Sequence, residues 1–133
     1  MADWTIVAID DDPAALKVLQ RRLSSNEQIR VLTAENAREG LALIDKERPN
    51  AIVIDHLPPD HAGISLCKTL KSNLSLKNIP ILFFTAYREF GFEACAEAAG
   101  ALRVIAKLDM PQLVAAIQRL KDPNSARPSD TED

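Results

Sequence analysis

The sequence predicts an α/β fold in which one parallel sheet carries helices on both faces. Short apolar runs alternate five times with stretches of helical periodicity, a pattern typical of successive βα units. Several runs are rich in Val and Ile with little polar alternation, as expected of strands that are buried on both faces. With 133 residues, of which 47% are hydrophobic, the chain is long enough for one domain with its own core.

Each predicted strand is one of the apolar runs, and each is followed by a predicted helix. The strands are Ile6–Ile9, Ile29–Thr33, Ala51–Ile54, Ile81–Thr85 and Leu102–Ala106.

The first two helices have clear start signals. Pro13 suits the first position of a helix, and Asp12 is placed to cap it. Asn36 starts the second helix, with Glu39 at the spacing of a capping box. The apolar face of the first helix carries Leu16, Leu19 and Leu23.

The later helices are located by their apolar periodicity and by their ends. The third is predicted over residues 63–74, and the fourth, which is rich in Ala, over residues 89–99 with Gly100 as the residue that ends it. The fifth begins after Asp109. The pattern stops at residue 122. We therefore expect a domain over residues 1–121 and a flexible tail or linker over residues 122–133, where apolar residues are few.

Composition and charge exclude several classes of function. The net charge is −3 and there is no basic stripe, so direct binding to nucleic acid is not expected. No apolar run approaches the roughly 18 residues of a membrane span, and the N-terminus lacks the form of a signal peptide. Cys67 and Cys95 lie in apolar helical patterns, which predicts two buried free thiols in a reducing compartment. Together these features predict a cytoplasmic domain with no membrane association.

Three consecutive aspartates, Asp10, Asp11 and Asp12, follow the first predicted strand directly. Two unit charges ~4 Å apart repel by about 4 kcal/mol at an effective dielectric constant of 20. A fold that keeps such a cluster usually has a cation to offset it. Asp12 serves mainly as the helix cap, which leaves Asp10 and Asp11 as candidate ligands. Taken alone, these two are equally well explained as turn residues.

Polar side chains also follow the later strands. Asp55 ends the third, Thr85 the fourth and Lys107 the fifth. In a parallel sheet the carboxyl ends share one edge, where ligands bind, so these side chains are expected to converge with the acidic cluster. Carboxylates suit Mg²⁺, and a lysine and a hydroxyl can hold the oxygens of a phosphoryl group. Alone, Lys107 reads as a solvated charge and Thr85 as a cap of the following turn.

Two histidines near Asp55 raise the alternative of a zinc site. His56 and His61 are five positions apart in a loop, which is not a standard pair of ligands. We expect both to face solvent near the mouth of the site.

These motifs resemble those of the receiver domain of two-component response regulators. The matching pieces are Asp10-Asp11-Asp12-Pro13, the segment from Asp55 to Gly63, Thr85-Ala86, and Lys107 six residues after Ala101. The resemblance covers residues 5–121. It implies a flavodoxin-like, doubly wound, five-stranded parallel sheet of order 2-1-3-4-5 with five helices.

The resemblance also implies a magnesium site. Asp11 would bind Mg²⁺ directly and Asp10 largely through water, beside Asp55. The backbone carbonyl of Leu57 would supply a third protein ligand.

The resemblance assigns the phosphoryl chemistry to three side chains. Asp55 would be the nucleophile that accepts a phosphoryl group from a phosphohistidine, Lys107 would pair with the phosphoryl oxygens, and Thr85 would donate a hydrogen bond to them. Pro59 and Gly63 would shape the loop after Asp55.

The expected function is a phosphorylation-dependent signalling switch. Its partners would be a histidine kinase or phosphotransfer protein and an unknown downstream effector protein. The domain would catalyse only its own phosphorylation and slow dephosphorylation, and so would not be an enzyme acting on other substrates. We expect Leu57 and Tyr87 to slow dephosphorylation by limiting access of water. The resemblance allows a homodimer, but the sequence selects no dimer face.

Two departures from the family pattern keep a second function open. Lys107 is followed by Leu108 where the family usually has Pro, and Val104 stands where it often has Tyr or Phe. A cis bond before a non-proline residue costs roughly 2.5–4 kcal/mol, so we expect a trans bond and a shifted loop after Lys107. Val104 removes the aromatic partner to which, in the family, the threonine at the position of Thr85 is coupled. A pseudo-receiver, which binds partners without phosphorylation, is therefore the alternative.

A third hypothesis is a phosphatase of the haloacid dehalogenase type. Such enzymes also combine an aspartate nucleophile with Mg²⁺, a hydroxyl and a lysine. Their nucleophile follows the first strand, however, and an acid pair follows the lysine, where this chain offers only Asp109. The chain is also short for that group.

Overall fold

The computed structural model describes residues 4–57 and 61–126. The sheet is fully parallel and has the order β2-β1-β3-β4-β5, as expected from the resemblance. The strands are β1 (Trp4–Ile9), β2 (Ile29–Ala34), β3 (Ala51–Ile54), β4 (Ile81–Thr85) and β5 (Arg103–Ala106).

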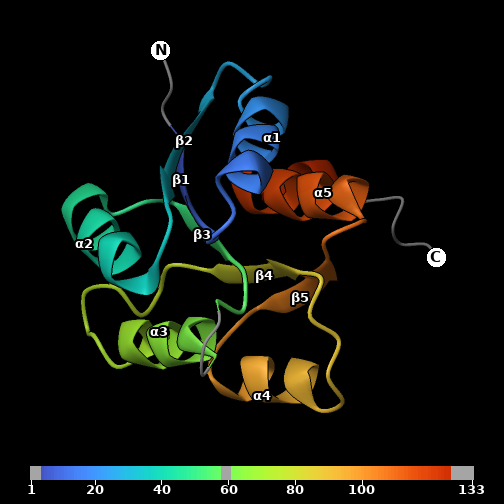
Figure 1. Cartoon of the computed structure of the whole chain (residues 1–133). Coiled ribbons are helices and arrows are strands. Elements are labelled where there is room, and N and C mark those ends of the chain that lie inside the picture. The colour runs from blue at the N-terminus through green and yellow to red at the C-terminus, as the bar shows by residue number, and fades with distance from the viewer. Residues whose placement is uncertain (1–3, 58–60, 127–133) are drawn as a thin grey trace.

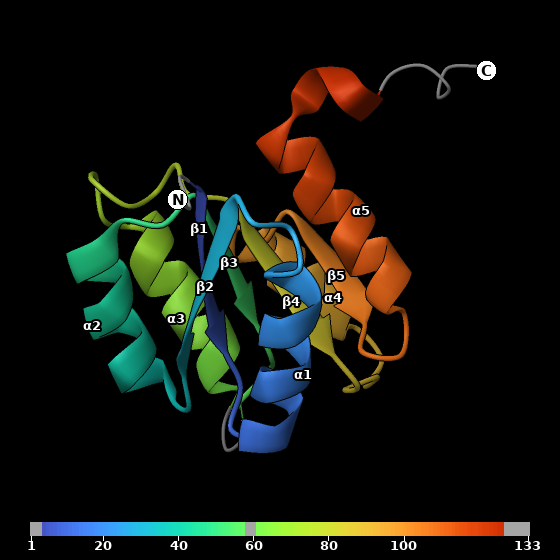
Figure 2. The same cartoon turned by 90° about the horizontal axis from the view of Figure 1, so that it is seen from above.

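Five α-helices cover the two faces of this sheet. Helices α1 and α5 lie on one face, and α2, α3 and α4 lie on the other (Figures 1 and 2). The helices are α1 (Pro13–Leu23), α2 (Ala37–Glu47), α3 (Ala62–Lys71), α4 (Phe92–Ala98) and α5 (Met110–Lys121), followed by a 3₁₀ helix, η1 (Pro123–Ala126). The 3₁₀ helix lies in the predicted tail, and residues 127–133 lie outside the described residues. None of the helices within the described residues has the length and apolar character needed to cross a membrane.

The helix caps anticipated from the sequence are present. The Asp12 carboxylate accepts a hydrogen bond from the Ala14 amide at 3.0 Å, and Asn36 accepts one from Glu39 at 2.8 Å. Gly100 has a φ of 113° and follows the last residue of the α4 cap, as predicted. Helix α4 begins three residues later than predicted.

Each face of the sheet has its own hydrophobic core. Ile44, Cys67, Leu70, Phe83 and Phe92 belong to the core under α2, α3 and α4, and Leu16, Leu19, Leu82, Ile105 and Leu113 belong to the core under α1 and α5. The strands between them are shielded on both sides, which explains their continuous apolar character.

The prediction of two buried thiols is confirmed for Cys67 and wrong for Cys95. Both cysteines are free, but Cys67 is buried and Cys95 is exposed. The buried stripe of α4 consists of Phe92 and Ala96 and continues to Ala99 in the cap. Cys95 lies beside this stripe, on the part of the helix that faces outward.

Candidate functional site

The register of the sheet brings the predicted site residues to one edge. Ile9 pairs with Ile54, so Asp10 and Asp55 leave neighbouring strands at the same level. The Asp55 amide also donates to the Ile9 carbonyl at 3.0 Å. On the other side, Thr85 pairs with Ala106, and Lys107 follows directly. This edge is where ligands bind in open α/β folds.

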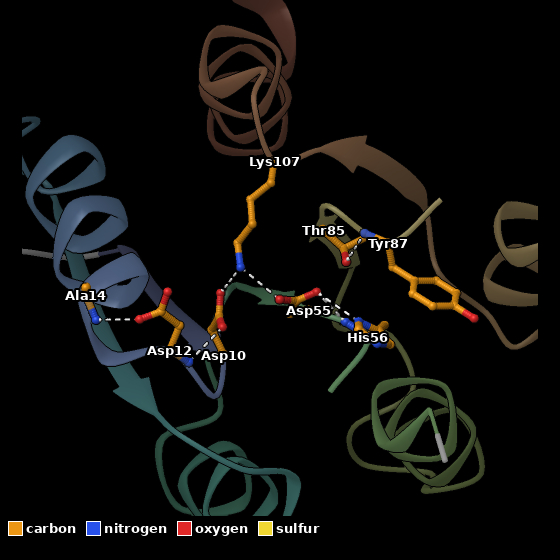
Figure 3. Close-up of polar contacts among 8 residues, drawn as sticks. All are labelled: Asp10, Asp12, Ala14, Asp55, His56, Thr85, Tyr87 and Lys107. Atoms are coloured by element: carbon orange, nitrogen blue, oxygen red, sulfur yellow. Dashed lines mark hydrogen bonds and ion pairs between the residues drawn. The ribbon is translucent and has the colours of Figure 1, made fainter. Parts of the chain in front are cut away.

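Lys107 connects the two buried aspartates. Its ammonium group donates a hydrogen bond to Asp55 Oδ2 at 2.8 Å and another to Asp10 Oδ2 (Figure 3). Asp10 and Asp55 are only 5% and 8% exposed. A buried carboxylate needs a charged or hydrogen-bonding partner, and Lys107 supplies one to both.

The structure also shows how the aspartate triplet divides. Carboxylate oxygens of Asp10, Asp11 and Asp55 all lie within 4.8 Å of one another. Asp12 faces α1, where it caps the helix as predicted. Three carboxylates around a single ammonium leave an excess of negative charge. All three ligand atoms are hard oxygens of the kind that Mg²⁺ prefers, so the residues fit this metal.

The two buried carboxyls titrate differently. Burial raises the pKa of Asp10 above its ordinary value, and the hydrogen bond from Lys107 offsets only part of this effect. Burial acts in the same direction on Asp55, but interactions with Lys107, the Thr85 hydroxyl and the His56 amide together hold its pKa below the ordinary value. For Lys107, burial acts to lower the pKa, and the two carboxylates outweigh it and raise the pKa. Asp55 is therefore held as an anion at neutral pH.

Leu57, two residues after Asp55, has a constrained backbone. Leu57 is buried and has a φ of 57°, a left-handed conformation that is costly for a residue with a Cβ. Its carbonyl accepts a hydrogen bond from the Ala62 amide at 2.9 Å. A carbonyl has a second lone pair, so the predicted role of Leu57 as a metal ligand stays a prediction. Pro59 lies outside the described residues.

Gly63 explains why α3 can begin directly under the site. A Cβ at this position would lie 2.4 Å from the Asp55 carbonyl oxygen. Real Cβ atoms essentially never come this close to a backbone atom. The close approach of α3 to the end of β3 therefore requires glycine.

Thr85 is buried at the end of β4. Its hydroxyl accepts a hydrogen bond from the Tyr87 amide at 3.0 Å and helps to lower the pKa of Asp55. Thr85 therefore both caps the following turn and faces Asp55.

Sequence reasoning missed the surroundings of His56. Its ring stacks on Tyr87, with centroids 4.2 Å apart and planes inclined by 19°, and its Nδ1 lies 3.4 Å from Asp55 Oδ1. The expectation that His56 faces solvent was therefore wrong, whereas His61 is exposed as expected. The contact between His56 and Tyr87 could have been predicted from the pairing of β3 with β4, because this pairing places the residues after Asp55 beside those after Thr85.

The two departures noted in the sequence occupy different surroundings. Val104 packs against the core under α4, while Leu108 is almost fully exposed. The Asp109 amide donates to the Ala106 carbonyl at 2.8 Å and so closes a turn around Lys107. The isomer of the bond between Lys107 and Leu108 stays a prediction.

Comparison with known proteins identifies the family. The model of the response regulator receiver domain matches residues 6–118. The chain belongs to this family. This receiver domain is 40% identical over 81 residues to the response regulator MprA of Mycolicibacterium vanbaalenii, a match covering 61% of the chain and 34% of MprA. It is 30% identical, again over 81 residues, to the response regulator PleD of Caulobacter vibrioides, of which the match covers 18%. The matched segment thus spans about a third or less of the length of these curated relatives.

Solved structures agree with the family and with the fold. The chemotaxis protein CheY4 of Vibrio cholerae is 27% identical, with a TM-score of 0.79, 90% of this chain covered and 99% of that chain. The receiver domain of a DNA-binding response regulator from Colwellia psychrerythraea is 22% identical and supports the fold alone, with a TM-score of 0.84 and with 90% and 99% of the two chains covered.

Proposed function

We propose that this receiver domain accepts a phosphoryl group on Asp55 in the presence of Mg²⁺ and acts as a phosphorylation-dependent switch. The observation that carries the proposal is the position of Asp55. Its carboxylate is buried, has a lowered pKa and bonds to Lys107, with Asp10 and Asp11 close by. A nucleophilic carboxylate, a fixed ammonium and an acidic cation site are the groups that phosphoryl transfer needs.

The donor is a phosphohistidine of a histidine kinase or phosphotransfer protein. A bond forms between an Asp55 carboxylate oxygen and phosphorus while the bond between phosphorus and the histidine nitrogen breaks, and the imidazole leaves with a proton. Lys107 holds the phosphoryl oxygens, and Thr85 donates its hydroxyl to them. Bound at Asp10, Asp11 and Asp55, Mg²⁺ supplies charge neutralisation for the phosphoryl group. The domain catalyses only this reaction and its own slow dephosphorylation, and a downstream effector protein binds the switched form.

The pseudo-receiver is the second candidate. It is favoured by Val104 and Leu108, which replace two residues of the usual switch. In that case partners bind the domain without any phosphoryl group.

Incubation with acetyl phosphate and Mg²⁺, followed by intact mass measurement, separates the two candidates. We expect a gain of one phosphoryl group in the wild type and none in Asp55→Asn. Asp45→Asn, which changes an exposed aspartate on α2, is the matched control and should gain the group normally. Failure of the wild type to gain mass under any condition would support the pseudo-receiver.

A further inference from the structure

An apolar pocket of about 240 Å³ lies between the start of α3 and the loop that leads into α4. It is separate from the acidic cluster. Its walls include His61, Ile64, Tyr87, Phe90, Phe92 and Cys95. Phe90 is fully exposed at this pocket, and large apolar side chains grouped on a surface mark binding sites.

Tyr87 joins this pocket to the phosphorylation site. On the pocket side its ring packs edge-on against Phe92, with centroids 5.0 Å apart, and its hydroxyl donates to Glu89 at 3.0 Å. On the other side it stacks on His56. Tyr87 is therefore part of the pocket wall and a neighbour of the Asp55 loop at the same time.

Two of the contacts of Tyr87 come from residues that face Asp55. The His56 ring forms the stack, and its backbone amide donates to Asp55 Oδ1 at 2.7 Å. The Thr85 hydroxyl accepts from the Tyr87 amide. A phosphoryl group on Asp55 would add charged oxygens next to His56 and would draw the Thr85 hydroxyl toward them. Both contacts of Tyr87 would weaken together.

We infer that this pocket is the surface through which the state of Asp55 is read, and that a partner protein occupies it with an apolar side chain flanked by a basic residue. The His56–Tyr87 stack controls access. Coupling between Asp55 and the pocket through Tyr87 does not need the aromatic residue that the family often has at position 104, where this chain has Val. The inference rests on the proposed function, because it needs a phosphoryl group on Asp55 to release Tyr87.

The charge of the pocket selects the partner. Glu89 is the charged side chain among the described residues that line it, and Glu93 is exposed in the first turn of α4. Neither Lys nor Arg is found among these lining residues. A basic group beside the inserted side chain would therefore meet complementary charge, and an acidic one would meet repulsion.

The test uses two short peptides as probes, N-acetyl-Phe-Arg-amide and N-acetyl-Phe-Glu-amide. Each is titrated into ¹⁵N-labelled protein while the amide signals of Ile64, Gly91 and Cys95 are followed. Acetyl phosphate and Mg²⁺ are added to a parallel sample, and its phosphoryl content is measured by intact mass. An aromatic stack biases an equilibrium by about two- to tenfold, so we expect the basic peptide to bind the phosphorylated form tighter by that factor.

Variants of His56 test the pocket even if no phosphoryl group is taken up. His56→Ala removes the stack and should bind the basic peptide about two- to tenfold tighter without acetyl phosphate. His56→Phe keeps a ring against Tyr87 and should bind as weakly as the unmodified wild type. Tyr87→Leu provides a second way to remove the stack if His56→Ala does not fold.

Each outcome bears on one proposal. Absence of the mass gain contradicts the proposed function and the phosphorylation step, while the His56 variants still decide whether the stack closes the pocket. A phosphorylated wild type whose pocket signals do not respond, or respond equally to both peptides, overturns the inference. Equal affinity of His56→Ala and His56→Phe for the basic peptide also overturns the inference.

Discussion

Lys107 donates a hydrogen bond to Asp55 Oδ2 across 2.8 Å, although 52 positions separate the two residues in the sequence. The bond spans β4, which lies between the strands that carry them. The same ammonium also bonds to Asp10. Lys107 thus bonds to carboxylate oxygens that are also candidate ligands of a metal ion. Competition between the ammonium group and Mg²⁺ for these oxygens can be measured.

Replacing Lys107 with Met should lower stability in Mg²⁺-free buffer and strengthen the binding of Mg²⁺. The variant leaves two buried carboxylates without their cation, which we expect to cost about 1–3 kcal/mol, less than for a fully buried pair because the Lys107 side chain is 23% exposed and water can partly replace it. Without the competing ammonium, Mg²⁺ should recover more stability than in the wild type. Urea unfolding with and without Mg²⁺ measures both effects, and weaker Mg²⁺ binding in the variant would contradict this reasoning.

Mg²⁺ should raise the melting temperature through Asp11. A ligand at ten times its dissociation constant stabilises the folded state by about 1.4 kcal/mol, or roughly 5 °C for a domain of this size. Asp11→Ala should lose this shift. Asp12→Ala is the matched control, because it should start from a lower melting temperature through loss of the α1 cap and still show the full shift. If Asp11→Ala kept the shift, Asp11 would not be a metal ligand.

The pKa shifts of the two buried aspartates predict opposite effects on acid stability without Mg²⁺. The lowered pKa of Asp55 contributes stability that is present above about pH 3.9 and is lost as the pH falls through its folded pKa. Asp55→Asn should therefore flatten the rise of stability with pH below about pH 3.9.

The raised pKa of Asp10 acts in the other direction. Between about pH 3.9 and the folded pKa, the native state binds more protons, so Asp10 makes stability fall as the pH rises. Asp10→Asn should remove that fall. Urea unfolding across this range compares the two variants, and changes of the same sign in the same window would contradict the assignment.

Gly63→Ala should disturb the site more than Gly40→Ala. A Cβ at Gly63 would strike the backbone of Asp55, which cannot move without moving the Asp55 carboxylate. A Cβ at Gly40 would meet the end of the Ile9 side chain, which can turn aside at lower cost. We expect Gly63→Ala to be less stable by about 2 kcal/mol or more and slower to gain a phosphoryl group. Chemical unfolding and the acetyl phosphate reaction measure the two effects, and equal behaviour of the variants would show that the α3 start is more adaptable than its geometry indicates.

Leu57 and Tyr87 should lengthen the life of the phosphoryl group. Leu57 is buried next to Asp55, and Tyr87 lies two residues after Thr85, whose hydroxyl faces Asp55. Leu57→Ala and Tyr87→Ala should admit water and speed the loss of label severalfold. The decay of phosphorylated protein, followed by intact mass after removal of acetyl phosphate, measures this. Decay at the wild-type rate in both variants would remove these residues from any role in lifetime.

The sequence predicted the strands and their shared edge because both follow from short-range patterns, whereas the strand order came from the family resemblance. The bounds of β3 and β4 agree with the prediction, since a strand buried on both faces is apolar throughout. Asp10, Asp55 and Lys107 meet because parallel strands end at one edge. Each of these three residues directly follows its strand, so the sheet itself determines where its side chain lies.

The contacts that prediction missed depend on loop conformation. Leu57 and His61 both adopt positive φ values without being glycine, and nothing in their residue type indicates this. Leu57 directly follows His56, whose ring stacks on Tyr87. Gly91 has a φ of 86° and precedes the first residue of α4, so the helix begins later than its apolar periodicity predicted. The aromatic cluster beside Asp55 therefore became visible only in the structure.

The double shielding of β3 has a consequence for the timescales of the domain. Its amides lie between two strands and under two cores, so their hydrogen exchange should require opening of the whole domain. Helix α4 has seven residues and buries only Phe92 and Ala96 of them, so its amides should exchange through local opening. Asp55 thus follows directly on a strand whose amides exchange only when the whole domain unfolds, while the pocket beside α4 can rearrange many times between two such unfolding events.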